Sequence, residues 1–288
     1  MDFVIPLHRM NPLFRATIEA ISLLYSPRQV YIITPLCEIE KIDWNRWDIG
    51  NTSIKCIAEE SFFSPISMTD LEMMYKKKDE KSREFGWWFQ QILKMGAVRQ
   101  ISGISDPYMV WDSDVIPIVR WEIYPTEECP YHRFAILQKE SRSEWNEQQY
   151  EESIWELVQM KAISPIEGTF VPHHFIMYKS VLEGLITRIE NISGKPWFMA
   201  ILSLSFTFWR FSEYKCLATY MNEIHPELLH YHTFDKYGNG FRFRDSIDIF
   251  KEIILLVPPE HTVPYSIILE YVRTKWEDCP TYIQLEHL

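Results

Sequence analysis

Short apolar runs alternate with stretches of helical periodicity over the first 120 residues of the chain. Apolar and β-branched residues bounded by turn-forming residues predict strands, and the predicted strands cover residues 2–7, 29–34, 53–58 and 108–111. A helix is predicted after the first strand, where Asn11 and Pro12 suit an N-cap and a first helical position, and another covers residues 83–98. Strands that alternate with helices in this way predict an α/β layered fold with a mostly parallel central sheet.

Helical periodicity dominates the rest of the chain. The predicted helices cover residues 145–161, 178–192, 196–206, 213–224, 245–256 and 265–276. The sequence contains no internal repeat, low-complexity segment or linker rich enough to separate two domains. We therefore expect an α/β half over residues 1–125 and a more helical half over residues 126–288, which together form one continuous domain.

Polar or acidic residues follow three of the four predicted strands. Ligands of open parallel sheets bind beyond the carboxyl ends of the strands, so the residues at these ends form one candidate edge. They are Leu7 and His8 at the end of the first strand, Glu59 and Glu60 at the end of the third, and Asp112 and Asp114 at the end of the fourth. An ordinary solvated turn remains an equal interpretation of Glu59 and Glu60.

Asp112 and Asp114 stand two residues apart at the end of an apolar strand, where alternate side chains point the same way. Carboxylate oxygens suit Mg²⁺ or Mn²⁺, and one or two carboxylates leave coordination positions for two oxygens of a nucleotide diphosphate. The metal would then neutralise the charge of the departing diphosphate. Alone, this Asp-x-Asp pair is a weak signal, because aspartate also caps ordinary turns.

Composition and charge narrow the classes of function. The net charge of −11 argues against a broad nucleic-acid-binding surface. Five scattered cysteines without a Cys-x-x-Cys pair are typical of a reducing compartment. The first residues do not have the basic start and apolar run of a signal peptide, and no apolar stretch is long enough to predict a transmembrane segment. We therefore expect a cytoplasmic protein.

Two segments carry a resemblance to a known family. They are Glu84–Lys94, which reads Glu-Phe-Gly-Trp-Trp-Phe-Gln-Gln-Ile-Leu-Lys, and Tyr108–Asp114, which reads Tyr-Met-Val-Trp-Asp-Ser-Asp. Together they resemble a family of GT-A-like glycosyltransferases long described as a domain of unknown function, with members in bacteria and in large algal DNA viruses. The resemblance extends to Pro172–His174, Trp197 and Phe211–Tyr214, and so covers roughly residues 1 to 215. A sugar transferase of a chlorella virus is one identity that it allows.

The resemblance implies a GT-A fold, with a nucleotide-sugar-binding half followed by an acceptor-binding half. It further implies a nucleotide-diphosphate sugar as donor, which we expect to be a UDP-sugar, and a glycan or glycoconjugate hydroxyl as acceptor. The positions that it assigns to the nucleotide and donor are Pro6, Leu7, His8, Arg9, Glu59, Gln91, Lys94, Trp111 and Ser113. Gln91 and Lys94 are three residues apart on a predicted helix and therefore share a face.

Mn²⁺ or Mg²⁺ is the implied cofactor, with Asp112 and Asp114 as ligands. GT-A enzymes often take a third ligand from a histidine late in the chain, and His232 is favoured by chain order over His173, His174 and His230. His173, His174 and Trp197 are the implied acceptor- or sugar-binding residues. A histidine or tryptophan in these positions is, however, more often an ordinary buried residue.

Transfer with inversion requires a general base for the acceptor hydroxyl. Glu213 follows Asp114 by 99 residues, stands next to the predicted N-cap Ser212, and matches the Ser-Glu-Tyr segment of the family. The resemblance therefore implies Glu213 as the base, although a glutamate in the first turn of a helix also stabilises the helix dipole.

Two alternatives remain. A phosphatase or phosphotransferase of the haloacid-dehalogenase kind uses an Asp-x-Asp pair, but that pair usually closes the first strand and a later acidic pair completes its metal site. A non-catalytic carbohydrate-binding protein would require neither the aspartate pair nor Glu213.

Overall fold

The structure is a computed structural model of the chain, and it describes residues 1–40, 47–76, 85–137, 144–204, 211–243, 251–253, 255–256 and 262–285. Most of the predicted helix at 245–256 lies outside the described residues, and so does Glu84 of the family-like segment.

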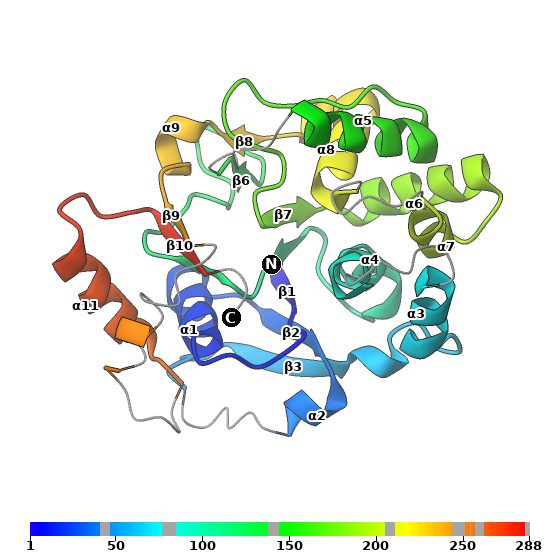
Figure 1. The fold of residues 1–288 in the computed structure, drawn as a ribbon. Coiled ribbons are helices and arrows are strands. Elements are labelled where there is room, and N and C mark those ends of the chain that lie inside the picture. The colour runs from blue at the N-terminus through cyan, green and yellow to red at the C-terminus, as the bar shows by residue number, and fades with distance from the viewer. Residues whose placement is uncertain are drawn as a thin grey trace.

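A five-stranded sheet forms the centre of the molecule, with strand order β3-β2-β1-β4-β7 (Figure 1). β1 pairs in parallel with β2 and with β4, β2 pairs in parallel with β3, and β7 alone runs antiparallel, beside β4. The predicted α/β fold with a mostly parallel central sheet is therefore confirmed. The strands are β1 (Asp2–Pro6), β2 (Gln29–Thr34), β3 (Ser53–Ala58), β4 (Tyr108–Trp111) and β7 (His174–Met177).

Helices cover the two faces of this sheet, and Figure 1 shows α1 and α4 on opposite sides of β1. α1 (Phe14–Tyr25) connects β1 to β2, and α4 (Phe85–Gln100) precedes β4. Two short helices, α2 (Leu36–Ile39) and α3 (Met68–Lys76), lie in the connections after β2 and β3. Because parallel strands need crossover connections, both faces become buried, and the strand residues of β1 and β4 are buried along their whole length.

α1 is buried on two sides. Phe14, Ile18 and Ile21 belong to the large core beside the sheet, whereas Ala16 and Ala20 pack into a second apolar cluster with the C-terminal helix α11 (Tyr265–Lys275). Small residues at positions four apart allow α11 to approach α1 closely. The C-terminal segment is thereby packed against the α/β half.

Helices dominate the described part of the second half, as predicted. They are α5 (Glu144–Val158), α6 (Lys179–Ser193), α7 (Trp197–Leu202), α8 (Glu213–Ile224) and the short α9 (Phe234–Tyr237), with 3₁₀ turns η2 (Glu59–Ser61) and η3 (Pro226–Leu228) elsewhere. None of the described helices combines the length and the apolarity that crossing a bilayer requires.

The sequence analysis missed six short strands. One of them is β7, in which His174 opens a strand that pairs with β4. The others are β5 (Val115–Pro117), β9 (Phe241–Phe243) and β10 (Tyr282–Leu285) in one sheet, and β6 (Phe134–Ala135) and β8 (Tyr231–His232) in another. Runs of two to four residues are too short to show an alternating pattern, so pairing partners distant in sequence define them.

Candidate functional site

The strand order creates a topological switch point at the carboxyl ends of β1 and β4. From β1 the chain moves outward to β2 and β3, and it then returns to β4 on the other side of β1. Ligands of open α/β sheets bind in the crevice beyond such a point. β1 ends at Pro6 and β4 at Trp111, so the structure brings the predicted residues Leu7 and Asp112 to this edge.

Lys94 of α4 lies between two carboxylates at this edge. Its Nζ is 2.6 Å from Oδ1 of Asp112 and 2.8 Å from Oε1 of Glu213, and the Lys94 side chain is 3% exposed. Glu213 opens α8, and its backbone N–H donates to Oε1 of Gln91 at 3.2 Å. The predicted shared face of Gln91 and Lys94 therefore exists, and both side chains contact Glu213.

The charges of this cluster shift the pKa values of its members. Burial alone would lower the pKa of Lys94, but the attraction of Asp112 and Glu213 outweighs burial and raises it. Burial raises the pKa of Glu213, and Lys94 opposes that rise. For Asp112, burial is outweighed by Lys94 and His173, which hold the pKa of the carboxyl well below its usual range. The ammonium and the Asp112 carboxylate are thus both ionised at neutral pH.

Asp112 has three side-chain partners. Besides Lys94, the hydroxyl of Tyr214 donates to Oδ1 at 2.9 Å, and Nδ1 of His173 is 2.9 Å from Oδ2. The ring of Tyr214 also lies beneath the ammonium of Lys94, 4.7 Å from Nζ to the ring centroid. α4, α8 and the segment before β7 therefore meet at this one carboxylate.

His173 adopts a backbone conformation that is unusual for its type. Its φ is 60°, in the left-handed region, and its carbonyl accepts a hydrogen bond from the N–H of Asp112 at 2.8 Å. A non-glycine residue in this region costs about 1 kcal/mol or more, and such strain gathers at functional sites. The His173 side chain is partly exposed, so this histidine lies at the surface of the cluster.

The opposite end of the same edge holds polar atoms that lack partners. The Glu59 side chain, directly after β3, is 3% exposed, and its Oε1 has no hydrogen-bond partner among the described residues; Nδ1 of His8 is 3.9 Å away. Burial, together with repulsion from Glu60, raises the pKa of Glu59 to about 7. Thr34, which ends β2, has a fully buried hydroxyl that also finds no partner in the described structure. Buried polar groups usually have a partner, so these two atoms would be completed by a water, an ion or a ligand.

Glu60 has a different role from Glu59. Both of its carboxylate oxygens accept from the N–H of Leu36 at 3.1 Å, at the start of α2. Glu38 of α2 in turn accepts from the N–H of Met10 at 2.9 Å. These bonds hold the loop after β1, in which the predicted donor-binding residues His8 and Arg9 are exposed.

Asp114 has a side-chain partner that Asp112 does not share. Its Oδ2 accepts from Nε2 of Gln284 in β10 at 3.1 Å, whereas the Asp112 carboxylate faces α4 and α8. The backbone carbonyl of Ser113, between them, accepts from the Thr17 hydroxyl at 3.0 Å. The Asp112 carboxylate therefore contacts residues of α4 and α8, whereas Asp114 contacts a residue of β10.

Two of the predicted acceptor-binding residues, His174 and Trp197, are buried. His174 is 0% exposed; one ring nitrogen contacts the carbonyl of Pro172 at 2.8 Å, and the other accepts from the N–H of Ala135 at 2.9 Å. Burial also lowers the pKa of His174 to about 3, so the ring is neutral. Trp197 is 3% exposed and packs against Phe63. Of the three predicted acceptor-binding residues, His173 is the one whose side chain is partly exposed.

The described residues do not bring the predicted ligands Asp112, Asp114 and His232 together as one three-ligand metal site. No group of three histidine, cysteine, aspartate or glutamate side chains within the described ranges could hold a metal ion together. His232, the predicted third ligand, is buried, and its Nε2 is 2.8 Å from the carbonyl of Glu122. Asp112 already has the ammonium of Lys94 and two further partners, the hydroxyl of Tyr214 and the ring of His173.

The sequence analysis did not assign Tyr214 or Thr34 to the site. Tyr214 directly follows the predicted base within the family-like segment, so its position was a usable signal. Thr34 ends a strand at the same edge as Glu59, and a polar residue at the carboxyl end of a buried strand is a second such signal.

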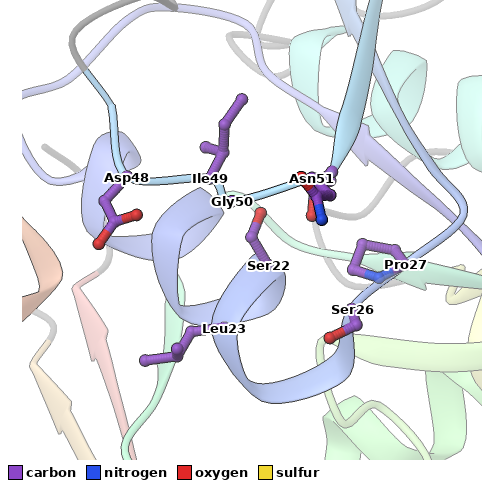
Figure 2. Close-up of a pocket in the computed structure, with 9 residues that line it drawn as sticks. Ser22, Leu23, Ser26, Pro27, Asp48, Ile49, Gly50 and Asn51 are labelled. Atoms are coloured by element: carbon purple, nitrogen blue, oxygen red, sulfur yellow. The ribbon is translucent and has the colours of Figure 1, made fainter.

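A separate cavity of about 330 Å³ lies at the other edge of the sheet. Figure 2 shows Ser22 of α1 pointing toward Gly50 and Asn51, in the segment before β3. Because this segment and the end of α1 precede the amino ends of β3 and β2, the cavity is remote from the switch point. None of the predicted site residues lines it; the lining residues are Ser22, Leu23, Ser26, Pro27, Asp48, Ile49, Gly50, Asn51 and Thr52.

Comparisons with known proteins give one family match. A family described as "Family of unknown function (DUF6492)" matches residues 7–240. Comparison with curated proteins finds no match.

Several solved structures are weakly similar. A crystal structure of an active-site mutant of LgtC has a TM-score of 0.44 and 11% identity, covering 100% of this chain and 88% of that chain. Mouse xyloside xylosyltransferase 1 has a TM-score of 0.41 and 10% identity, covering 99% and 98%. The bifunctional glycosyltransferase WbbM has a TM-score of 0.38 and 9% identity, covering 100% and 46%.

Proposed function

Because the chain belongs to the DUF6492 family of unknown function, its activity has to be inferred from its own site, and we propose that it is a glycosyltransferase. The donor is a nucleotide-diphosphate sugar, which we expect to be a UDP-sugar, and the acceptor is a hydroxyl group of a glycan or glycoconjugate. The observation that carries the proposal is that one edge of the parallel sheet holds two chemically different subsites, one at β2 and β3 and one at β4.

The first subsite consists of the orphan acceptors Glu59 Oε1 and Thr34 Oγ1. A nucleoside supplies the matching donors, since ribose hydroxyls and base N–H groups both donate hydrogen bonds. An acidic residue near the end of a strand commonly accepts from ribose in nucleotide-binding sheets. Glu59 and Thr34 therefore suit the nucleoside end of the donor.

The second subsite is the charged cluster of Lys94, Asp112 and Glu213. β4, which leads into this cluster, is three strand positions from β3, which leads into Glu59. At a strand spacing of ~4.8 Å, the two subsites are therefore ~14 Å apart. A ligand that uses both subsites must be elongated, with hydrogen-bond donors at one end and its reacting group at the other. A nucleotide sugar has this form, and the switch point between β1 and β4 lies between its two ends.

Glu213 is the proposed general base. The acceptor oxygen attacks the anomeric carbon, the bond from that carbon to the diphosphate oxygen breaks, and the hydroxyl proton passes to the Glu213 carboxylate. Burial raises the pKa of Glu213, which increases its basicity, and Lys94 fixes its position. A base opposite the leaving group predicts inversion at the anomeric carbon.

The proposal is tested with a panel of nucleotide sugars, with release of the nucleotide diphosphate as the measurement. The wild type should turn over one donor, and Glu213→Gln should lower kcat by about 10²–10⁴-fold while its far-UV circular dichroism is unchanged. Glu223→Gln, an exposed position near the other end of α8, is the matched control and should retain normal turnover. Absence of turnover with every donor would contradict the proposed function. Near-normal turnover by Glu213→Gln would contradict the proposed base.

A further inference from the structure

The carboxylate of Asp112 is close to its capacity for hydrogen bonds. A carboxylate oxygen accepts about two hydrogen bonds. Oδ1 has both, from the ammonium of Lys94 at 2.6 Å and the hydroxyl of Tyr214 at 2.9 Å, and Oδ2 has the ring nitrogen of His173 at 2.9 Å. A metal ion on Asp112 would therefore have to displace one of these partners or share the remaining lone pair.

Of these partners, Lys94 opposes metal binding at Asp112 most strongly, because it is a buried cation paired with that carboxylate. Its three N–H groups are matched by Asp112, Glu213 and the face of the Tyr214 ring. The side chain is 3% exposed, so there is little solvent to receive the ammonium if it is displaced. A divalent ion next to the same carboxylate would be repelled by the ammonium by more than the energy of a tenfold change in affinity.

We propose that Asp112, together with Tyr214, is a positioning residue, and that its resident cation is Lys94 rather than a metal ion. Through Lys94, Asp112 orients the Glu213 carboxylate, and through its Oδ2 it orients His173. Asp114, whose Oδ2 accepts from the neutral amide of Gln284, is then the member of the pair that would contact a donor-associated metal. The role of Glu213 in this scheme rests on the proposed function.

The proposal separates Asp112 from Asp114, which the Asp-x-Asp pattern treats as equivalent. Free Mn²⁺ is measured by electron paramagnetic resonance as the ion is titrated into wild type, Asp112→Asn and Asp114→Asn, each with UDP present. Asp112→Asn should leave the Kd for Mn²⁺ within about twofold, and Asp114→Asn should raise it about tenfold or more. Equal loss of Mn²⁺ binding in both variants would overturn the proposal.

The substitution Lys94→Met should change the affinity for Mn²⁺ in the opposite direction. Removal of the ammonium leaves Asp112 without its cation, so Mn²⁺ should bind about tenfold more tightly, and Lys94→Met/Asp112→Asn should return to the wild-type Kd. If the wild type binds no Mn²⁺, this gain is the deciding result. An unchanged or weaker affinity in Lys94→Met would show that the lysine does not occupy the cation position.

Tyr214→Phe is a conservative variant that removes only one hydrogen bond to Asp112. It should leave Mn²⁺ affinity unchanged and lower kcat about tenfold, with KM for the donor within about twofold, because it disturbs the position of Lys94 and not donor contact. A Tyr214→Phe variant with altered Mn²⁺ affinity would indicate that Tyr214 supports a metal ligand. Failure of the wild type to turn over any donor would contradict the proposed function. The Mn²⁺ titrations would still decide whether Asp112 binds a metal ion.

Discussion

At the scale of single residues, Glu59 is the least satisfied charge that the structure describes at the candidate edge. Its Oε1 has no hydrogen-bond partner in the described part of the chain, and burial raises its pKa to about 7. The sequence placed both Glu59 and Glu60 at the end of a strand, and the strand pattern did not distinguish their environments. Only the fold separates them, because Glu60 binds the amino end of α2 while Glu59 is enclosed.

Glu59→Gln should change stability in a pH-dependent way. Since the pKa of Glu59 in the folded protein is about 7, above its ordinary 4.5, folding favours the protonated form. That favourable contribution is complete below about pH 4.5 and is lost as the pH rises through about 7. Glu59→Gln should therefore be more stable than wild type by about 1–3 kcal/mol near pH 8, a range that allows for screening by nearby solvent, and equal to it near pH 4. Urea unfolding at the two pH values measures the difference.

The same variant should bind UDP about tenfold more weakly, because a charge-assisted hydrogen bond to the nucleoside becomes a neutral one. Isothermal titration measures this affinity. Glu60→Gln is the matched control, and its UDP affinity should stay near that of wild type. Loss of affinity in Glu60→Gln but not in Glu59→Gln would show that the wrong glutamate has been assigned to the nucleoside.

At the scale of elements, α8 brings the proposed base to the site. Ser212 is its N-cap, with an extended backbone and a hydroxyl that accepts from the N–H of Lys215 at 3.3 Å. Ser212 and the start of α8 at Glu213 were both predicted from the sequence, because N-cap chemistry is local. The contact of Glu213 with Lys94 was not predicted, because it joins residues 119 positions apart.

Ser212→Ala should destabilise the protein by about 1 kcal/mol, since the N–H of Lys215 loses its partner at a buried helix end. Thermal unfolding followed by circular dichroism measures the shift. Ser180→Ala, at an exposed serine of α6, serves as the control and should change stability by less than about 0.5 kcal/mol. An equal effect of both substitutions would mean that the cap contributes nothing specific.

At the scale of the whole molecule, Glu19 joins three segments that are distant in the sequence. From α1, its Oε1 accepts from Arg15 at 2.6 Å and from the N–H of Asp48 at 2.9 Å, and its Oε2 accepts from the N–H of Tyr265 at 2.8 Å. The carboxylate is 4% exposed and lies where α11 begins. It therefore fixes the C-terminal helix on the α/β half.

Glu19→Ala should cost about 3 kcal/mol, because two buried N–H groups and Arg15 lose their acceptor. The loss should be concentrated in α11, so hydrogen exchange of amides 265–275 should accelerate more than that of the central strands. Glu270→Ala, at an exposed glutamate of α11, is the control and should leave exchange in this helix nearly unchanged. Uniform acceleration over the whole chain would instead indicate that Glu19 supports global stability only.

The sequence by itself determined the elements whose signals are local. Apolar runs and helical periodicity predicted β1 to β4, α1, α4, α6 and α8, and the order of these elements predicted the parallel sheet and its ligand-binding edge. It also placed Glu59, Lys94, Asp112 and Glu213 among the candidate site residues. The predictions of the elements and of the parallel sheet succeeded because propensity, capping and crossover geometry act over short stretches of chain.

The tertiary structure decided which side chains meet. It enclosed His174 and Trp197, turned Asp112 and Asp114 toward different partners, and placed Lys94 between Asp112 and Glu213. Burial and ion pairing depend on contacts between α4, β4, α8 and β10, which no local pattern encodes. The Asp-x-Asp pair could therefore be located from the sequence, whereas the cation on Asp112 could be identified only from the folded chain.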